Sequence, residues 1–217
     1  MKKLLLLFFT FCFLVSIGQD QDPKAKLILD DLSKNTKTYK TILAEVAFTM
    51  YNKEKKAIEK PQIWKIQVKG QKFRLEIPGT SIVCDGVTLW NYNKDAKEVT
   101  IKTFDPLSDE QNPSKIFTMY ETGYKYTYDT EKKVGLVNCS VINLFPAIKP
   151  EKKKFHTVKL SIDKIKKQMI QLIMLMKDGG TQVYDIRSLK TNSDLADKLF
   201  VFDTKGLKPD QINDERD

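Results

Sequence analysis

Apolar residues at every second position are the feature that most limits what this chain can fold into. From Thr41 onward they share one face, as Ile42, Ala44, Val46 and Phe48 do in "TILAEVAFTMY". A period of two is typical of a half-buried β-strand. The period returns in "PQIWKIQVKG", "QKFRLEIPG", "KEVTIKTF", "YKYTYDT", "GLVNCSVINLFP", "FHTVKLSID", "KQMIQLIMLMK", "TQVYDIRSLK" and "LFVFDT". We therefore predict a mainly β (α+β) chain of about eleven antiparallel strands, whose sheet must curl into a barrel or split in two.

The segment "SIVCDGVTLWNYN", residues 81 to 93, departs from this alternation. Asp85-Gly86 predicts a tight hairpin turn. In the strand after the turn, Val87 and Leu89 fall on one face and Trp90 and Tyr92 on the other. A strand that is apolar on both faces belongs to a sheet that is covered on both sides. The inner space is then a packed core or a cavity under a lid, and large aromatic and methionine side chains do not decide between them.

Two helices are expected beside the strands. In "DPKAKLILDDLSKNTKTY", Asp22 is a suitable N-cap, Pro23 suits the first helical position, and an apolar stripe follows at helical spacing. In "NPSKIFTMYETG", Asn112-Pro113 repeats this start, and Gly123 is the expected end. The second helix would interrupt the run of strands.

The N-terminus has the pattern of a secretory signal peptide. Lys2 and Lys3 are followed by an apolar stretch from Leu4 to Val15 and by a small-x-small cleavage site at residues 16–18. We expect cleavage between Gly18 and Gln19, giving a signal peptide at 1–18 and a single domain at 19–217. The apolar stretch is shorter than the roughly 20 residues of a membrane span. Cys12 is preceded and followed by large residues, which disfavours a lipid anchor.

The composition is that of a basic protein with a sizeable core. Hydrophobic residues make up 41% of the chain, and the formal net charge is +9. Such a charge could attract anionic membrane surfaces or acidic partners. No nucleic-acid-binding motif accompanies the lysines, and Lys152 to Lys154 are expected to form a solvated loop.

Few residues suggest covalent chemistry. Cys84 and Cys139 could form a disulfide in an oxidising compartment or remain two buried thiols, and the sequence leaves both possibilities open. His156 is the single histidine, and neither metal-ligand spacing nor a nucleophile-elbow motif accompanies it. We expect no catalytic residue, no metal site and no cofactor.

Taken together, these segments resemble the LolA family of periplasmic carriers of outer-membrane lipoproteins. The resemblance rests on "GTSIVCDGVTLWNYN" followed by "EVTI", on "AEVAFTM" and "WKIQVKGQKFRLEI" after the first helix, and on "TQVYDIRSLKTNSDLADKLFVFDTKGLKPD" at the end. It implies an incomplete antiparallel β-barrel closed by an N-terminal helix and a lid helix around a hydrophobic cavity. The cavity residues that it implies are Phe48, Trp64, Phe73, Trp90, Tyr92, Ile101, Phe117, Tyr120, Tyr124, Tyr126, Leu144 and Met174.

The resemblance also implies a lid with a latch. Ile116, Phe117 and Tyr120 would belong to the lid helix. Family members carry a basic residue in the turn after the "W-x-x-x-V-K" strand, where this chain has Gly70. Arg74 is the nearest arginine, and it is either the latch or an outward-facing charge.

The implied function is carriage without catalysis. The chain would be a periplasmic monomer that takes up acylated lipoproteins from an inner-membrane ABC transporter and delivers them toward the outer membrane, with or without an acceptor there. A carrier of another amphiphile, such as a glycolipid or pigment, is the main alternative. A lipid-anchored receptor of related fold, a hydrolase using His156 and a purely structural envelope protein are the others.

Overall fold

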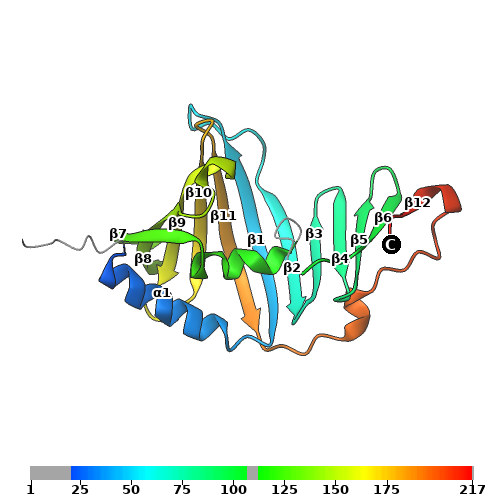
Figure 1. The fold of residues 1–217 in the computed structure, drawn as a ribbon, viewed down its shortest axis with the longest axis horizontal. Coiled ribbons are helices and arrows are strands. Elements are labelled where there is room, and N and C mark those ends of the chain that lie inside the picture. Colours follow the sequence, from blue (N-terminus) through cyan, green and yellow to red (C-terminus); the bar gives the residue numbers. More distant parts are fainter. Residues whose placement is uncertain (1–20, 107–111, 217) are drawn as a thin grey trace, which may run out of the picture.

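A single, strongly curved sheet of twelve strands dominates the computed structural model, which describes residues 21–106 and 112–216 (Figure 1). Its order is β12-β6-β5-β4-β3-β2-β1-β11-β10-β9-β8-β7, and the two edge strands do not pair with each other. This confirms the predicted mainly β fold with an incomplete barrel. The predicted signal peptide and its cleavage site lie outside the described residues, so the division into 1–18 and 19–217 stays a prediction.

The strands follow the predicted alternation closely. Strands β1 to β6 are Thr41–Tyr51, Gln62–Lys69, Lys72–Ile77, Thr80–Cys84, Thr88–Asn93 and Glu98–Thr103. Strands β7 to β12 are Tyr124–Val134, Val137–Pro146, Phe155–Asp163, Met169–Met176, Thr181–Thr191 and Ile212–Asp214. The long central strand β1 pairs with β2 and β11, and a register shift against β11 lies between Glu45 and Val46. Irregularities of this kind increase the local bend of a sheet.

Two predictions about regular elements are wrong. "LFVFDT" is not a strand: it begins in the 3-10 helix η4 (Asp197–Phe200) and continues as extended chain over the outer face of the sheet. The closing strand is β12, which pairs with β6 in parallel. The expected lid helix is not an α-helix, because residues 113–121 form two 3-10 turns, η1 (Pro113–Phe117) and η2 (Met119–Glu121). Helices this short are marginal, so side-chain packing decides their geometry.

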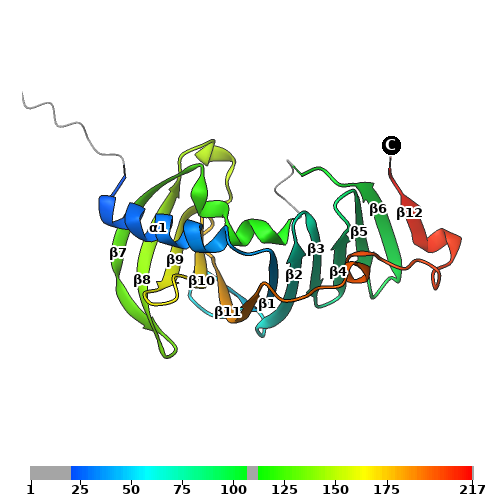
Figure 2. The same ribbon diagram turned by 90° about the horizontal axis from the view of Figure 1, so that it is seen from below.

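The helix α1 (Pro23–Thr36) covers the inner face of the β7–β10 half of the sheet (Figure 2). Asp22 caps it as predicted, by accepting hydrogen bonds from the backbone N–H groups of Lys24 and Ala25. The same carboxylate accepts a hydrogen bond from the N–H of Tyr128 on the edge strand β7, 2.8 Å away. That bond is the main reason that the pKa of Asp22 lies below its ordinary value. The cap therefore also joins the helix to the sheet edge.

Three hydrophobic clusters hold the sheet in shape. The first joins Ala25, Leu29 and Leu32 of α1 to the inner faces of β8, β9 and β10. The second joins the inner faces of β1 to β5 to Phe104 and Phe117. The third lies on the outer face, where the C-terminal segment covers β4, β5 and β6. The space between the first two clusters is the place where a ligand could enter the fold.

Candidate functional site

The segment that carries η1 and η2, residues 112–123, lies across the inner space between the two halves of the sheet. Ile116 packs against both inner clusters, whereas Phe117 belongs to the β1–β5 cluster and Tyr120 to the α1 cluster. Phe117 and Tyr120 are each only 3% exposed. The sequence predicted these three as lid residues, and here they fill part of the inner space themselves. We call residues 112–123 the covering segment.

Polar contacts tie the covering segment to α1. The Ser33 hydroxyl donates a hydrogen bond to the Glu121 carboxylate, and Lys37 Nζ lies 3.7 Å from the same group. The Tyr120 hydroxyl donates to Thr36 Oγ1 over 3.4 Å, and burial raises the pKa of Tyr120 to about 12. These contacts are few and mostly at the surface, so their rupture would cost little compared with that of the inner clusters.

An apolar pocket of about 740 Å³ lies under the covering segment. This volume is within the range of about 300–1,000 Å³ that is usual for small-molecule sites. One wall comes from β2, β3 and β4 and the other from β7, β9, β10 and β11. The residues that line these walls are Trp64, Ile66, Leu75, Ile82, Tyr124, Phe155, Met174 and Tyr184. The pocket therefore spans both halves of the sheet.

The rings of Trp64 and Tyr184 form the floor of the pocket on the central strands, and Phe48 packs behind them. The ring centroids of Phe48 and Trp64 are 4.6 Å apart, and those of Phe48 and Tyr184 are 4.9 Å apart. The Tyr184 hydroxyl donates to Gln182 Oε1 at 3.0 Å, and burial raises the pKa of Tyr184 to about 12. The floor is therefore uncharged at neutral pH. The charged lining residues, Lys115, Glu121 and Lys153, belong to the covering segment and to a loop rather than to the sheet walls.

The predicted cavity residues divide into three groups. Trp64, Tyr124 and Met174 line the pocket directly, with Phe48 stacked behind Trp64. A second group packs within the two inner clusters without reaching the pocket walls: Phe73, Phe117, Tyr120, Tyr126 and Leu144. Sequence reasoning missed Ile66, Leu75, Ile82, Met119, Phe155 and Tyr184. Alternation along each strand assigns the strand residues of this set to a face of the sheet. Only the order of the strands shows which of these residues lie together around the pocket.

Trp90, Tyr92 and Ile101 form the third group, and their placement in the cavity is wrong. Trp90 and Ile101 are buried on the outer face together with Val83 and Val99, beneath the C-terminal segment. The rings of Tyr92 and Phe202 lie 5.0 Å apart on the same face. Leu89 points to the inner cluster and Val87 is exposed at the turn. The hairpin is apolar on both faces because the C-terminal segment covers its outer side.

The assignment of Arg74 to the lid is also wrong. Its Nε lies 2.8 Å from Glu76 Oε1, and its Nη1 donates to the Leu199 carbonyl at 3.1 Å. Arg74 therefore lies on the outer face, where it holds the start of the C-terminal segment. Asp197 of that segment is paired with Lys69 and Lys72, at 2.9 and 3.3 Å. The turn at Gly70, with φ of +61°, reaches a smaller cavity of about 300 Å³ whose lining includes Phe117.

The two cysteines are free buried thiols, so the possible disulfide is not formed. Cys84 packs in the inner cluster on β4, whereas alternation along β8 places Cys139 on the outer face. Six strands lie between β4 and β8 in the sheet. A bridge needs Cα atoms less than about 7 Å apart, which this topology does not allow.

Native protein is therefore expected to react slowly with thiol reagents. Burial raises the pKa of Cys84 to about 11 and also raises the pKa of Cys139. At pH 8 only about a thousandth of the Cys84 groups would be the reactive thiolate. Titration with a chromogenic disulfide should show no fast thiol in the folded mature protein and two after denaturation. A mass two units below that of the reduced chain would contradict this expectation.

His156 is exposed, and its Nδ1 lies 2.9 Å from Thr157 Oγ1. Residues 21–106 and 112–216 contain no group of three or more histidine, cysteine, aspartate or glutamate side chains placed to hold a metal ion. Within the same residues, no helix is long and apolar enough to cross a membrane.

Comparison with known families places this pocket in context. The model of the family described as "Outer membrane lipoprotein carrier protein LolA" matches residues 64–203. The chain belongs to the LolA family. By this description, LolA proteins are carriers of outer-membrane lipoproteins. The match includes both walls of the pocket and the covering segment. A search of curated proteins gave no match.

The chain is also similar to proteins of known structure. An uncharacterized conserved protein from Thermus thermophilus superposes with a TM-score of 0.57 at 14% identity, covering 89% of this chain and 99% of that one. The lipoprotein LppX of Mycobacterium tuberculosis superposes with a TM-score of 0.46 at 12% identity, covering 81% and 100%. A LolA superfamily protein from Nitrosomonas europaea gives 0.41 at 14%, covering 82% and 97%. At these identities the likeness concerns the fold alone.

Proposed function

We propose that this chain is a periplasmic carrier that binds the acyl chains of lipoproteins in the pocket under the covering segment. It would take them from an inner-membrane ABC transporter and deliver them toward the outer membrane as a monomer. The observation that carries the proposal is the apolar pocket of about 740 Å³, uncharged along its sheet walls and spanning both halves of a LolA-type sheet. The proposal assigns no catalytic step to the chain.

The physical need for such a pocket follows from the size of an acyl chain. Burial of a methylene group stabilises by about 0.8 kcal/mol, so exposing a chain of sixteen carbons to water costs on the order of 12 kcal/mol. A carrier has to recover most of that free energy in an apolar site. The aromatic floor of Trp64 and Tyr184, backed by Phe48, and the flexible Met174 provide such a surface.

Release requires that the protein also be stable with an empty pocket. Ile116 lines the pocket and packs against both inner clusters, and Phe117 and Tyr120 beside it fill the inner space between them. Incoming acyl chains would displace part of the covering segment, whose contacts with α1 are few. The return of the segment would then favour delivery. A ligand can shift such an equilibrium only by its differential affinity for the two states.

The test is a release assay with spheroplasts of the source organism. Purified mature protein is added, and mass spectrometry identifies the acylated proteins that co-elute with it in the soluble fraction. Newly made lipoproteins should appear with the wild-type chain. The variant Met174→Lys, which places a charge in the pocket, should lose them almost completely because an unpaired buried charge is so unfavourable.

Leu136→Lys is the matched control, because Leu136 is fully exposed in the β7–β8 turn and does not line the pocket. It should release lipoproteins as well as the wild type does. A wild-type protein that emerges empty would contradict the proposal. Recovery of only a glycolipid or pigment would assign the pocket to another amphiphile.

A further inference from the structure

Three connections meet at one end of the sheet. They are the β1–β2 loop (52–61), the β8–β9 connection (147–154) and the β10–β11 turn (177–180), at the top of Figure 1. The Lys177 N–H donates to the Lys154 carbonyl at 2.9 Å, and Lys177 Nζ donates to the Pro150 carbonyl at 2.7 Å. At Gly179 an added Cβ would lie 3.0 Å from the Cβ of Lys53. The three connections therefore form one continuous surface, which we call the basic rim.

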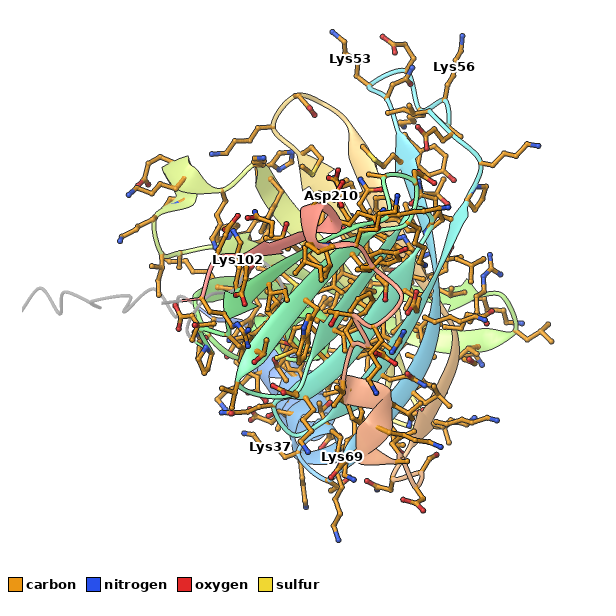
Figure 3. All side chains as sticks on the ribbon, turned by 90° about the vertical axis from the view of Figure 1, so that its right-hand side faces the viewer. Lys37, Lys53, Lys56, Lys69, Lys102 and Asp210 are labelled. Carbon is orange, nitrogen blue, oxygen red and sulfur yellow. The ribbon has the colours of Figure 1, made fainter. Side chains whose placement is uncertain are left out.

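The charge of the rim is strongly positive. It contains nine lysines and four carboxylates, a formal charge of +5 out of +9 for the whole chain. The lysines are Lys53, Lys55, Lys56, Lys60, Lys149, Lys152, Lys153, Lys154 and Lys177, and all are exposed. None of these nine lysines forms an ion pair with a carboxylate of the described residues, 21–106 and 112–216. Figure 3 shows Lys53 and Lys56 extending away from the end of the sheet.

Apolar side chains are exposed among these lysines. Ile58 in the β1–β2 loop is 56% exposed, and Ile148 in the β8–β9 connection is 62% exposed. The β1–β2 loop is ordered by a bridge between Tyr51 and Ala57 and by the Ile58 N–H, which donates to the Met50 carbonyl. It therefore presents Ile58 on a fixed turn of chain.

The pocket reaches the surface at the same place. Ile148 and Lys153 of the rim line the pocket, although both are exposed to solvent. Gly123, at the end of the covering segment, lies against Ile148: a Cβ there would be 3.7 Å from its Cδ1. One edge of the pocket and the end of its cover therefore belong to the basic rim.

We propose that the basic rim docks on the surface of a membrane that contains anionic phospholipids, so that the pocket faces the bilayer. Lysines near such a surface attract it through the negative potential of its head groups, and isoleucines among them can enter the region between head groups and acyl chains. An acidic protein would match the charge but would give no reason for isolated isoleucines beside an acyl pocket. The inference rests on the proposed carrier function. It adds the surface through which the carrier would contact a membrane.

Vesicle flotation tests the docking directly. Mature protein is mixed with vesicles of phosphatidylglycerol or of phosphatidylcholine at low and high salt, and the bound fraction is measured. Binding should be confined to phosphatidylglycerol and weaken with salt. A variant with Lys53, Lys56, Lys152 and Lys154 changed to Gln, none of which lines the pocket, should bind more than tenfold more weakly, since one lysine at an anionic surface accounts for about fivefold. Ile58→Asn should lower binding by a smaller factor.

The matched control changes Lys34, Lys133, Lys166 and Lys205 to Gln, four exposed lysines outside the rim that form no ion pair with a described carboxylate. It carries the same net charge as the rim variant and should bind almost as well as the wild type. Equal losses in the two variants, or wild-type binding to phosphatidylcholine, would overturn the proposal. Absence of wild-type binding to phosphatidylglycerol would also overturn it and leave an acidic protein as the better partner.

The docking and carrier proposals can fail separately. Binding of a fluorescent fatty acid in solution reports on the pocket without a membrane. The rim variant should retain this binding, whereas Met174→Lys should lose it and still float with phosphatidylglycerol. If the wild-type protein floats with the vesicles but releases no lipoprotein, the docking proposal is supported and the proposal that lipoproteins are the cargo is contradicted.

Discussion

Replacement of Trp90 by alanine is expected to lower the melting temperature by about 10 °C while leaving acyl-chain binding unchanged. Trp90 is 9% exposed on the outer face, in the cluster that holds the C-terminal segment on β4, β5 and β6. Removal of a buried tryptophan side chain costs about 3–5 kcal/mol. Thermal denaturation measures the first effect, and titration with a fluorescent fatty acid measures the second.

Trp64→Ala is the matched variant, because these are the two tryptophans of the chain. Trp64 is half-buried and lines the pocket, so its loss should weaken fatty-acid binding about tenfold or more and cost less stability than the loss of Trp90. In the remaining single-tryptophan proteins, ligand should change the emission of Trp64 and leave that of Trp90 unaltered. If Trp90→Ala lost binding at unchanged stability, the outer placement of Trp90 would be contradicted.

Phe117→Ala is expected to destabilise the protein and to strengthen ligand binding at the same time. Phe117 is 3% exposed and packs in the β1–β5 cluster, so its truncation should lower the free energy of unfolding by about 3–5 kcal/mol. The same side chain lines the smaller cavity, and Thr118 beside it lines both that cavity and the main pocket. Its removal would connect the two spaces. Each methylene of ligand that enters the new space adds about 0.8 kcal/mol.

Phe73→Ala separates the two effects. Phe73 lies in the same cluster, 1% exposed and 5.7 Å from the Phe104 ring centroid, but it lines neither cavity. It should destabilise the protein to a similar degree without tightening the binding of long fatty acids. Denaturant unfolding and fatty-acid titration on the two variants provide the comparison. Weaker binding by Phe117→Ala would show that Phe117 supports the pocket rather than filling it.

The local parts of the fold were predictable because their causes are local. Alternation places side chains on the two faces of a strand whatever the neighbours are, and it located β1 to β11. Asp22-Pro23 defined the start of α1, and Asp85-Gly86 the turn between β4 and β5, where the Asp85 carboxylate accepts from the N–H groups of Val87 and Thr88. The covering segment was located by Asn112-Pro113 and Gly123, but not its 3-10 geometry, which depends on packing.

The sequence by itself determined that Trp90 and Leu89 lie on opposite faces and that both faces had to be covered. It could not determine which face is the inner one, because that depends on which distant segment covers each side. The tertiary structure decided it: Phe202, Leu207 and Ile212 cover Trp90, while Phe104 and Phe117 lie in the cluster of Leu89. The pocket likewise exists because the strand order brings β2–β4 opposite β7–β11 under residues 112–123. Burial rewards contact whatever the separation along the chain, so these partners are set by the whole fold and not by local sequence.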